Sequence, residues 1–147
     1  MKKIIYDLGA SVGENIPYYL LRSDLIIAVE ANQKSCQTIK EKFYNEIDNG
    51  KLIVENCILS VSDNNEDYFF LHKNDHLLSQ FPKPSDDLIN KFTRIKLPKK
   101  NIHSLINKYG TPYYIKIDLE KYDNIILKKI FDLNINPNYI SAEAINN

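Results

Sequence analysis

A glycine-containing loop near the N-terminus has the residue types of a ligand-binding turn. Gly9 and Gly13 are two of the four glycines of the chain, and Asp7 precedes them in the stretch YDLGASVGEN. A glycine turn lets a ligand contact the backbone, and a following helix offers free N–H groups. The dinucleotide fingerprint GxGxxG would need a glycine where this chain has Ser11. The same glycines also suit an ordinary tight turn between a strand and a helix.

Glu30 is a second candidate, because it ends the apolar run LIIAVE and follows Gly13 by 17 residues. A carboxylate at the end of such a strand accepts hydrogen bonds from both hydroxyls of a ribose. A solvated strand end is the alternative interpretation of Glu30 alone. Taken together, the glycine loop and Glu30 favour a site for a ligand that contains adenosine.

Three charged residues occur close together in the stretch YYIKIDLEKYD. Strand alternation places Lys116 and Asp118 on the same side, and Glu120 follows at the strand end. Charges in a buried parallel strand are costly, by several kcal/mol each, unless they are paired. A structural ion pair of Lys116 with one of the two carboxylates would explain them. Their position at the end of a strand favours a functional site.

The hydrophobic pattern predicts the elements that position these residues. Continuous or alternating apolar runs, rich in β-branched and aromatic residues, predict strands at 3–8, 25–30, 52–55, 68–71, 92–97, 113–119 and 139–143. Apolar residues at helical spacing predict helices at 14–22, 33–47, 101–109 and 124–133. The segment QFPKPSDD, marked by its prolines, is a predicted loop.

This alternation of strands and helices predicts an α/β fold with a Rossmann-like, doubly wound, mostly parallel sheet flanked by helices. Right-handed crossovers place the carboxyl ends of the strands, with Gly9, Glu30, Glu55 and Asp118, along one edge of the sheet. Ligands bind beyond that edge in such sheets. The length of 147 residues fits a single domain over 1–147.

Composition and charge exclude several classes of protein. Hydrophobic residues make up 44% and charged residues 26% of the chain, which is ordinary for a soluble protein. The formal net charge of +0 gives no footprint for nucleic acid or an anionic membrane, and no apolar run could span a bilayer. Cys36 and Cys57 are too few for a disulfide framework and indicate a cytoplasmic protein. No ligand cluster at metal-binding spacing occurs, so no metal is predicted.

At these residues the chain resembles the FkbM family of S-adenosylmethionine-dependent methyltransferases. YDLGASVGEN resembles the first motif of that family, and AVEAN its ribose-binding second motif. VENCILSVSD is similar to the segment after the third strand, and IKIDLEKYD to the signature K-I-D-[IV]-E-G. ISAEA resembles the fifth strand, and HLLSQFPKP a stretch of some members. The resemblance covers nearly the whole chain in consistent order and implies S-adenosyl-L-methionine as the cofactor.

The resemblance implies roles for individual residues. The first loop would hold the amino-acid portion of the methyl donor, Glu30 its ribose, and Asn56 with Cys57 its adenine. The candidate donor-binding residues are Asp7, Gly9, Ala10, Ser11, Gly13, Asn15, Glu30, Ala31, Asn56, Cys57 and Asp118. The candidate catalytic residues are Asp118, Glu120, His76 and Lys116.

Methylation of a hydroxyl needs a base, because the oxygen loses its proton during or after attack. Asp118, Glu120, His72 and His76 are the candidates, and His76 ranks above His72 because it lies in the family-like segment DHLLSQF. The acceptor expected from the resemblance is a hydroxyl on a small molecule or glycan. A noncatalytic domain that binds S-adenosylmethionine or a nucleotide, and an NAD-dependent oxidoreductase, are the alternative functions.

Two features depart from the family pattern. Lys121 stands where the signature usually has glycine. The chain also stops just after the fifth predicted strand, where class I methyltransferases normally continue with a helix and an antiparallel strand pair. The resemblance therefore implies a C-terminally shortened domain, and the sheet edge that this exposes favours a homodimer.

Overall fold

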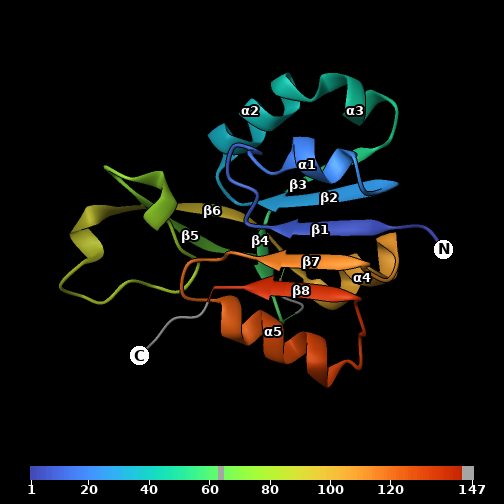
Figure 1. Ribbon diagram of the computed structural model, residues 1–147. Coiled ribbons are helices and arrows are strands. Elements are labelled where there is room, and N and C mark those ends of the chain that lie inside the picture. The colour runs from blue at the N-terminus through green and yellow to red at the C-terminus, as the bar shows by residue number, and fades with distance from the viewer. Residues whose placement is uncertain (63–64, 144–147) are drawn as a thin grey trace.

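A parallel five-stranded sheet forms the centre of the molecule. The computed structural model describes residues 1–62 and 65–143, and Figure 1 shows their arrangement. The strand order is β3-β2-β1-β7-β8, and every pair in this sheet is parallel. The strands are β1 (Ile4–Leu8), β2 (Leu25–Glu30), β3 (Leu52–Asn56), β7 (Tyr114–Ile117) and β8 (Tyr139–Ala142). The predicted Rossmann-like α/β fold is confirmed.

Helices cover both faces of this sheet. On one face lie α1 (Ile16–Leu20), α2 (Gln33–Lys42) and α3 (Tyr44–Asp48), and on the other α4 (Ile102–Tyr109) and α5 (Asp123–Asp132). Side chains alternate along each strand, so β1 sends Tyr6 and Leu8 to the α4–α5 face and Ile5 to the α1–α2 face. The apolar runs seen in the sequence are continuous because the central strands are buried on both sides.

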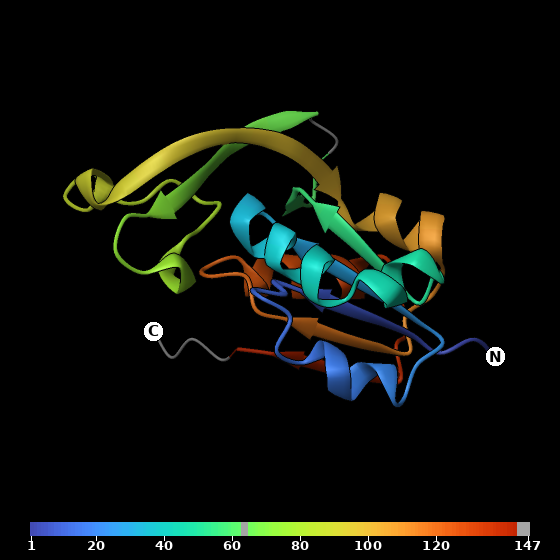
Figure 2. The ribbon, with the colours of Figure 1, turned by 90° about the horizontal axis from the view of Figure 1, so that it is seen from above.

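A second sheet forms an arm beside the first. It has the order β4-β6-β5, with β4 (Ile58–Ser60) parallel to β6 (Phe92–Asn101) and β5 (Glu66–His72) antiparallel to it. The connection between β5 and β6 contains the short 3₁₀ helices η1 (His76–Leu78) and η2 (Ile89–Lys91). Figure 2 shows that this hairpin reaches beyond the carboxyl ends of the parallel strands. It therefore overhangs the edge where the sequence predicts a ligand.

Some predicted boundaries were wrong. The helix predicted at 33–47 is broken at Phe43, whose φ of −118° and ψ of 37° end α2. Phe43 is buried and Ile47 is partly buried, and both pack into the α1–α2 core. The strand predicted at 92–97 continues to Asn101, because residues 99–101 pair with β4, a short strand that the sequence did not reveal. The helix predicted at 14–22 is only Ile16–Leu20.

None of the helices in the described part of the chain combines the length and the apolar composition that a membrane span requires.

Candidate functional site

The loop after β1 is held by contacts within the protein. Gly9 has a φ of +85°, and a Cβ atom added there would lie 1.9 Å from the carbonyl oxygen of Asp118. Gly13 has a φ of +81°, and a Cβ there would meet Ile16 at 2.9 Å and Phe43 at 3.0 Å. Both glycines are therefore required by the protein's own packing, as in the tight-turn interpretation. The turn brings the loop after β1 against the end of β7.

Glu30 ties this loop to the end of β2. One carboxylate oxygen accepts a hydrogen bond from the Ser11 N–H at 2.8 Å, and the other accepts from the Asn32 N–H at 2.8 Å. Burial raises the pKa of Glu30, and the backbone N–H groups oppose this shift. A carboxylate offers about four lone-pair sites, so roughly two remain for a ligand. Glu30 can thus order the loop and still accept hydrogen bonds from a ribose.

The residues after β2 are fixed in the same way. The side chain of Asn32 caps α2 by accepting from the N–H groups of Lys34 and Ser35, at 3.0 and 3.4 Å. The side-chain amide of Asn56, at the end of β3, donates to the carbonyl oxygens of Glu30 and Ala31, both at 3.0 Å. This rim of the sheet is therefore shaped before any ligand arrives.

Beneath the loop lies a buried ion pair between neighbouring strands. The Nζ atom of Lys116 lies 3.1 Å from Asp7 Oδ1, 3.1 Å from the Gly9 carbonyl oxygen and 3.4 Å from Asp118 Oδ2. Burial raises the pKa of Asp7 although Lys116 opposes it, and Asp7 in turn raises the pKa of Lys116 against the effect of burial. The structural ion pair considered from the sequence exists, and it includes Asp7 as well as Asp118.

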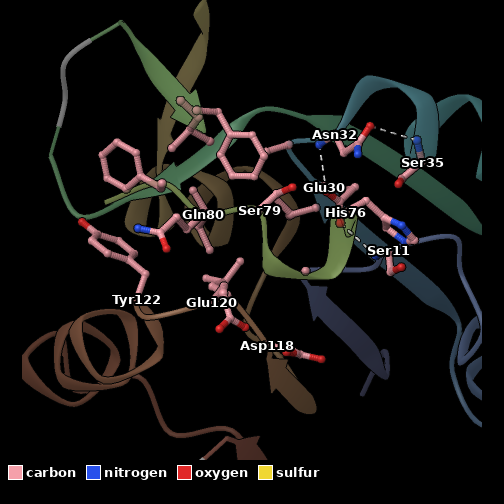
Figure 3. Close-up of a pocket in the computed structure, with 18 of the residues that line it drawn as sticks. Ser11, Glu30, Asn32, Ser35, His76, Ser79, Gln80, Asp118, Glu120 and Tyr122 are labelled. Carbon is pink, nitrogen blue, oxygen red and sulfur yellow. Dashed lines mark hydrogen bonds between the residues drawn. The ribbon is translucent and has the colours of Figure 1, made fainter. Parts of the chain in front are cut away.

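A pocket opens at the carboxyl edge of the sheet, under the β5–β6 hairpin (Figure 3). Its empty space, counted together with the open mouth, is about 770 Å³. We call Gly9, Ser11, Glu30, Ala31 and Asn32 the β1–β2 wall. We call His76, Gln80, Asp118, Glu120 and Tyr122 the β7–hairpin wall. The apolar residues that line the pocket between the two walls are Val29, Cys57, Ile58, Leu59, Phe69, Leu77, Phe81 and Leu119.

Two polar side chains of the β7–hairpin wall, those of Glu120 and His76, have no partner among the described residues, whereas Gln80 donates to the Pro82 carbonyl oxygen. The Asp118 side chain is 53% exposed, and among the described residues its carboxylate pairs with the ammonium group of Lys116. No hydrogen bond or ion pair from residues 1–62 or 65–143 reaches the Glu120 carboxylate or the His76 ring. Burial raises the pKa of Glu120, and the neighbouring charges of Glu143 and Asp118 add to this shift.

The turn after Glu120 keeps the shape that a glycine would favour. Lys121, which replaces the glycine of the family signature, has a φ of 63°. A lysine in this left-handed conformation is strained, by about 1 kcal/mol. The backbone at Lys121 therefore has a conformation that glycine adopts without strain.

The candidate residues from the sequence divide into two groups. Those that line the pocket are Gly9, Ser11, Glu30, Ala31, Cys57, His76, Asp118 and Glu120. Those that lie outside its lining are Asp7, Ala10, Gly13, Asn15, Asn56 and Lys116. The second group contains residues that support the loop or the rim, such as Lys116, which donates to the Gly9 carbonyl oxygen, and Asn56, which donates to the Ala31 carbonyl oxygen.

Two other candidates have different surroundings. Glu55, expected at the same edge, instead pairs with Lys100, Lys108 and Tyr109 on the α4 side of β3. The Nδ1 atom of His72 accepts from the Asp75 N–H at 3.0 Å, within the hairpin. Within the described residues, no group of three or more His, Cys, Asp or Glu side chains could hold a metal ion.

Several lining residues were not identified from the sequence. They include Asn32, Ser35, Ser79, Gln80, Phe81 and Tyr122. Three of them lie in LSQF, one in LEKYD and one, Asn32, in AVEAN, stretches that the family resemblance had already marked. That resemblance was the available signal, since nothing in a polar or aromatic side chain itself shows that a hairpin will fold over the sheet edge.

Comparison with known proteins shows the fold. No protein-family model matches the chain, and no curated protein matches it by sequence. The crystal structure of methyltransferase FkbM from Methylobacillus flagellatus KT matches 88% of this chain, with a TM-score of 0.52 and 18% sequence identity. The match spans about 28% of the length of that protein. The chain therefore has a methyltransferase-like Rossmann fold.

Proposed function

We propose that the pocket binds S-adenosylmethionine and that the protein transfers its methyl group to a hydroxyl of a small molecule or glycan. The observation that carries the proposal is the position of Glu30, whose carboxylate ends β2, faces the pocket and orders the loop after β1. A ribose with two free hydroxyls needs such an acceptor. The fold shared with methyltransferase FkbM supports the same conclusion.

The polar groups of the site fit this ligand. The Ser11 hydroxyl lines the pocket and is a buried polar atom without a hydrogen-bond partner among the described residues. Such a group is costly to bury unless a ligand or water satisfies it. The β1–β2 wall would hold the adenosine, with Glu30 on the ribose, and Cys57 would lie against the base. Asp118 lies beside Gly9, where the wall meets β7.

Methyl transfer from this donor requires mainly that the protein position the acceptor. The donor, when bound, presents a methyl group on a positive sulfur; the acceptor oxygen forms the new C–O bond while the C–S bond breaks and sulfur keeps its electron pair. The chain's task is to align the acceptor with that methyl group and to exclude water. The hydroxyl proton must pass to a base, and His76, Asp118 and Glu120 are the pocket groups able to take it.

An NAD-dependent oxidoreductase is less compatible with the same pocket. A dinucleotide brings a pyrophosphate with two negative charges, whereas no Lys or Arg occurs among the described residues that line the pocket. Position 11 of the loop also carries Ser11 in place of the fingerprint glycine. The positive sulfur of S-adenosylmethionine suits the three lining carboxylates better.

Thermal unfolding with S-adenosylhomocysteine, and with NADH as the control, tests the proposal. A ligand at 100 times its dissociation constant adds about 2.7 kcal/mol to the free energy of unfolding. That raises the unfolding midpoint of a domain of this size by several degrees. A shift with S-adenosylhomocysteine alone is expected. A shift with NADH alone, or with neither ligand, would refute the proposed donor site. Donor binding without turnover of any acceptor would favour a noncatalytic binding domain.

A further inference from the structure

The Asp, Glu, His, Lys and Arg side chains that line the pocket comprise three carboxylates and one histidine. Among the described lining residues they are Glu30, His76, Asp118 and Glu120. The whole chain carries 19 basic and 19 acidic side chains, so the composition alone would not produce this separation. The described lining therefore offers carboxylates and no lysine or arginine, an arrangement that favours cationic ligands.

Glu120 differs from the other two carboxylates. Glu30 accepts from two backbone N–H groups, and Asp118 lies 3.4 Å from the Nζ atom of Lys116. In the described parts of the chain, no donor lies within hydrogen-bond distance of the Glu120 carboxylate. Burial raises its pKa, and Glu143 and Asp118 raise it further. The described residues thus place a carboxylate in the pocket and supply no direct partner for it.

None of the lysines near this wall in the described part of the chain pairs with Glu120, although Lys116 lies 3.4 Å from Asp118 Oδ2. Lys116 is held by Asp7 and by the Gly9 carbonyl oxygen, and Lys99, which lies over the Phe81 ring, pairs with Asp67 at 3.0 Å. Lys121 is exposed, and its lowering effect on the pKa of Glu120 is smaller than the opposing effects of Glu143 and Asp118. The cation that would pair with Glu120 is therefore one that a ligand brings.

The surroundings of Glu120 suit an organic ammonium group. Figure 3 shows Asp118 and Glu120 along one side of the pocket, with Gln80 and Tyr122 at its end. The Tyr122 ring packs edge-on against Phe81 with ring centres 5.0 Å apart, which fixes an aromatic surface on this wall. Carboxylates and aromatic rings together are common partners of amines in proteins.

We propose that the β7–hairpin wall selects an acceptor that carries a protonated amine near its hydroxyl, such as an amino sugar, and that Glu120 binds this ammonium group. The inference rests on the proposed function, because it assigns the β1–β2 wall to the methyl donor. An acceptor with a phosphate or carboxylate at this place would meet carboxylates and no lining cation.

Matched sugars test this selection. The protein is first saturated with S-adenosylhomocysteine and then titrated, by calorimetry, with glucosamine, N-acetylglucosamine and glucosamine 6-phosphate. A charge-assisted hydrogen bond predicts that glucosamine binds about tenfold more tightly than N-acetylglucosamine, and that the phosphate weakens binding. In Glu120→Gln the difference should fall to less than about twofold. Asp132→Asn, a change of an exposed acid on α5, is the matched control and should keep the preference.

Each result decides between the two proposals. Equal affinity for the two sugars, tightest binding of the phosphate, or no binding of glucosamine would overturn the amine selection and leave donor binding intact. A preference that persists in Glu120→Gln would overturn the role of Glu120. If S-adenosylhomocysteine itself fails to bind, the proposed function fails at the first step, before any sugar is added.

Discussion

The two walls of the pocket differ in how their polar groups are satisfied. In the β1–β2 wall, Glu30 and Asn32 already bind backbone N–H groups of the protein. In the β7–hairpin wall, Glu120 and His76 lack such partners within the described residues. A wall that is ordered in advance loses little freedom on binding, whereas free polar groups remain to discriminate between ligands. The difference indicates one wall for an invariant ligand and another for a selected one.

Substituting Gly9 should break the β1–β2 wall most severely. In Gly9→Ala the new Cβ would lie 1.9 Å from the Asp118 carbonyl oxygen, at a φ of +85°. We expect a loss of more than about 4 kcal/mol in the free energy of unfolding, measured by urea denaturation. Gly50→Ala is the control, because Gly50 has a φ of +76° but nothing within 4 Å of its added Cβ. That change should cost only about 1–2 kcal/mol, and similar losses in both variants would contradict the close approach.

Removing the positive charge of Lys116, which lies beneath the loop after β1, should lower the free energy of unfolding by an amount that depends on pH. Lys116→Met leaves Asp7 buried without its partner, which costs about 3 kcal/mol at pH 7.5. The pKa of Asp7 is already raised by burial, and losing Lys116 raises it further. The deficit should therefore be smallest below the ordinary pKa of 3.8 and grow as the pH rises through the raised pKa.

Urea denaturation across this pH range measures that deficit. The double variant Lys116→Met with Asp7→Asn is the control, since position 7 then carries no carboxylate that could titrate. A deficit in Lys116→Met that stays constant between acidic and neutral pH would show that Asp7 is not the group involved.

Replacing Glu30 tests whether the β1–β2 wall binds the methyl donor. Glu30→Gln should weaken binding of S-adenosylhomocysteine by about 2 kcal/mol, roughly 30-fold, because it removes charge-assisted hydrogen bonds. Since burial raises the pKa of Glu30, wild-type affinity should fall with decreasing pH before the ordinary pKa of 4.5 is reached. Calorimetric titration measures both effects. Glu41→Gln, an exposed change on α2, should bind normally; an unchanged affinity in Glu30→Gln would remove Glu30 from the ribose.

Replacing Lys121 should change the free energy of unfolding less than Gly9→Ala or Lys116→Met does, and it should raise it. Lys121→Gly places glycine at a φ of 63° and should raise the free energy of unfolding by about 0.5 kcal/mol, after the greater freedom of glycine in the unfolded chain is subtracted. Urea denaturation of the two proteins measures the difference. A clear loss of stability would mean that the lysine side chain makes a stabilising contact.

Glu120 should matter least for the fold. Because no group among residues 1–62 and 65–143 pairs with its carboxylate, Glu120→Gln should change the free energy of unfolding by less than about 0.5 kcal/mol. Its affinity for S-adenosylhomocysteine should stay within about twofold of wild type. A large change in either quantity would show that the β7–hairpin wall is as interlinked as the other wall.

The central sheet was predictable because its strands are continuous apolar runs. β1 and β2 are buried on both faces, and Glu30 stands out as a charge at the end of such a run. The strand β4 was not predictable, since three residues carry little pattern and its partner, Lys99–Asn101, lies far along the chain. Local periodicity does not encode pairing over such separations.

The site was predictable only in part for a related reason. The sequence marks Gly9 and Gly13 as special but does not say what lies against them; the structure places Asp118 and Phe43 there. Residues of the hairpin, such as Gln80, reach the pocket through the tertiary arrangement of the second sheet. Polar and aromatic side chains in a loop carry no local signal of that arrangement.

A crystal structure of the protein with S-adenosylhomocysteine tests the central claim most directly. The account predicts the ribose hydroxyls on the Glu30 carboxylate, the sulfur near Asp118 and the space beside Glu120 left open for an acceptor. A ligand bound outside the pocket, or one whose ribose avoids Glu30, would contradict it.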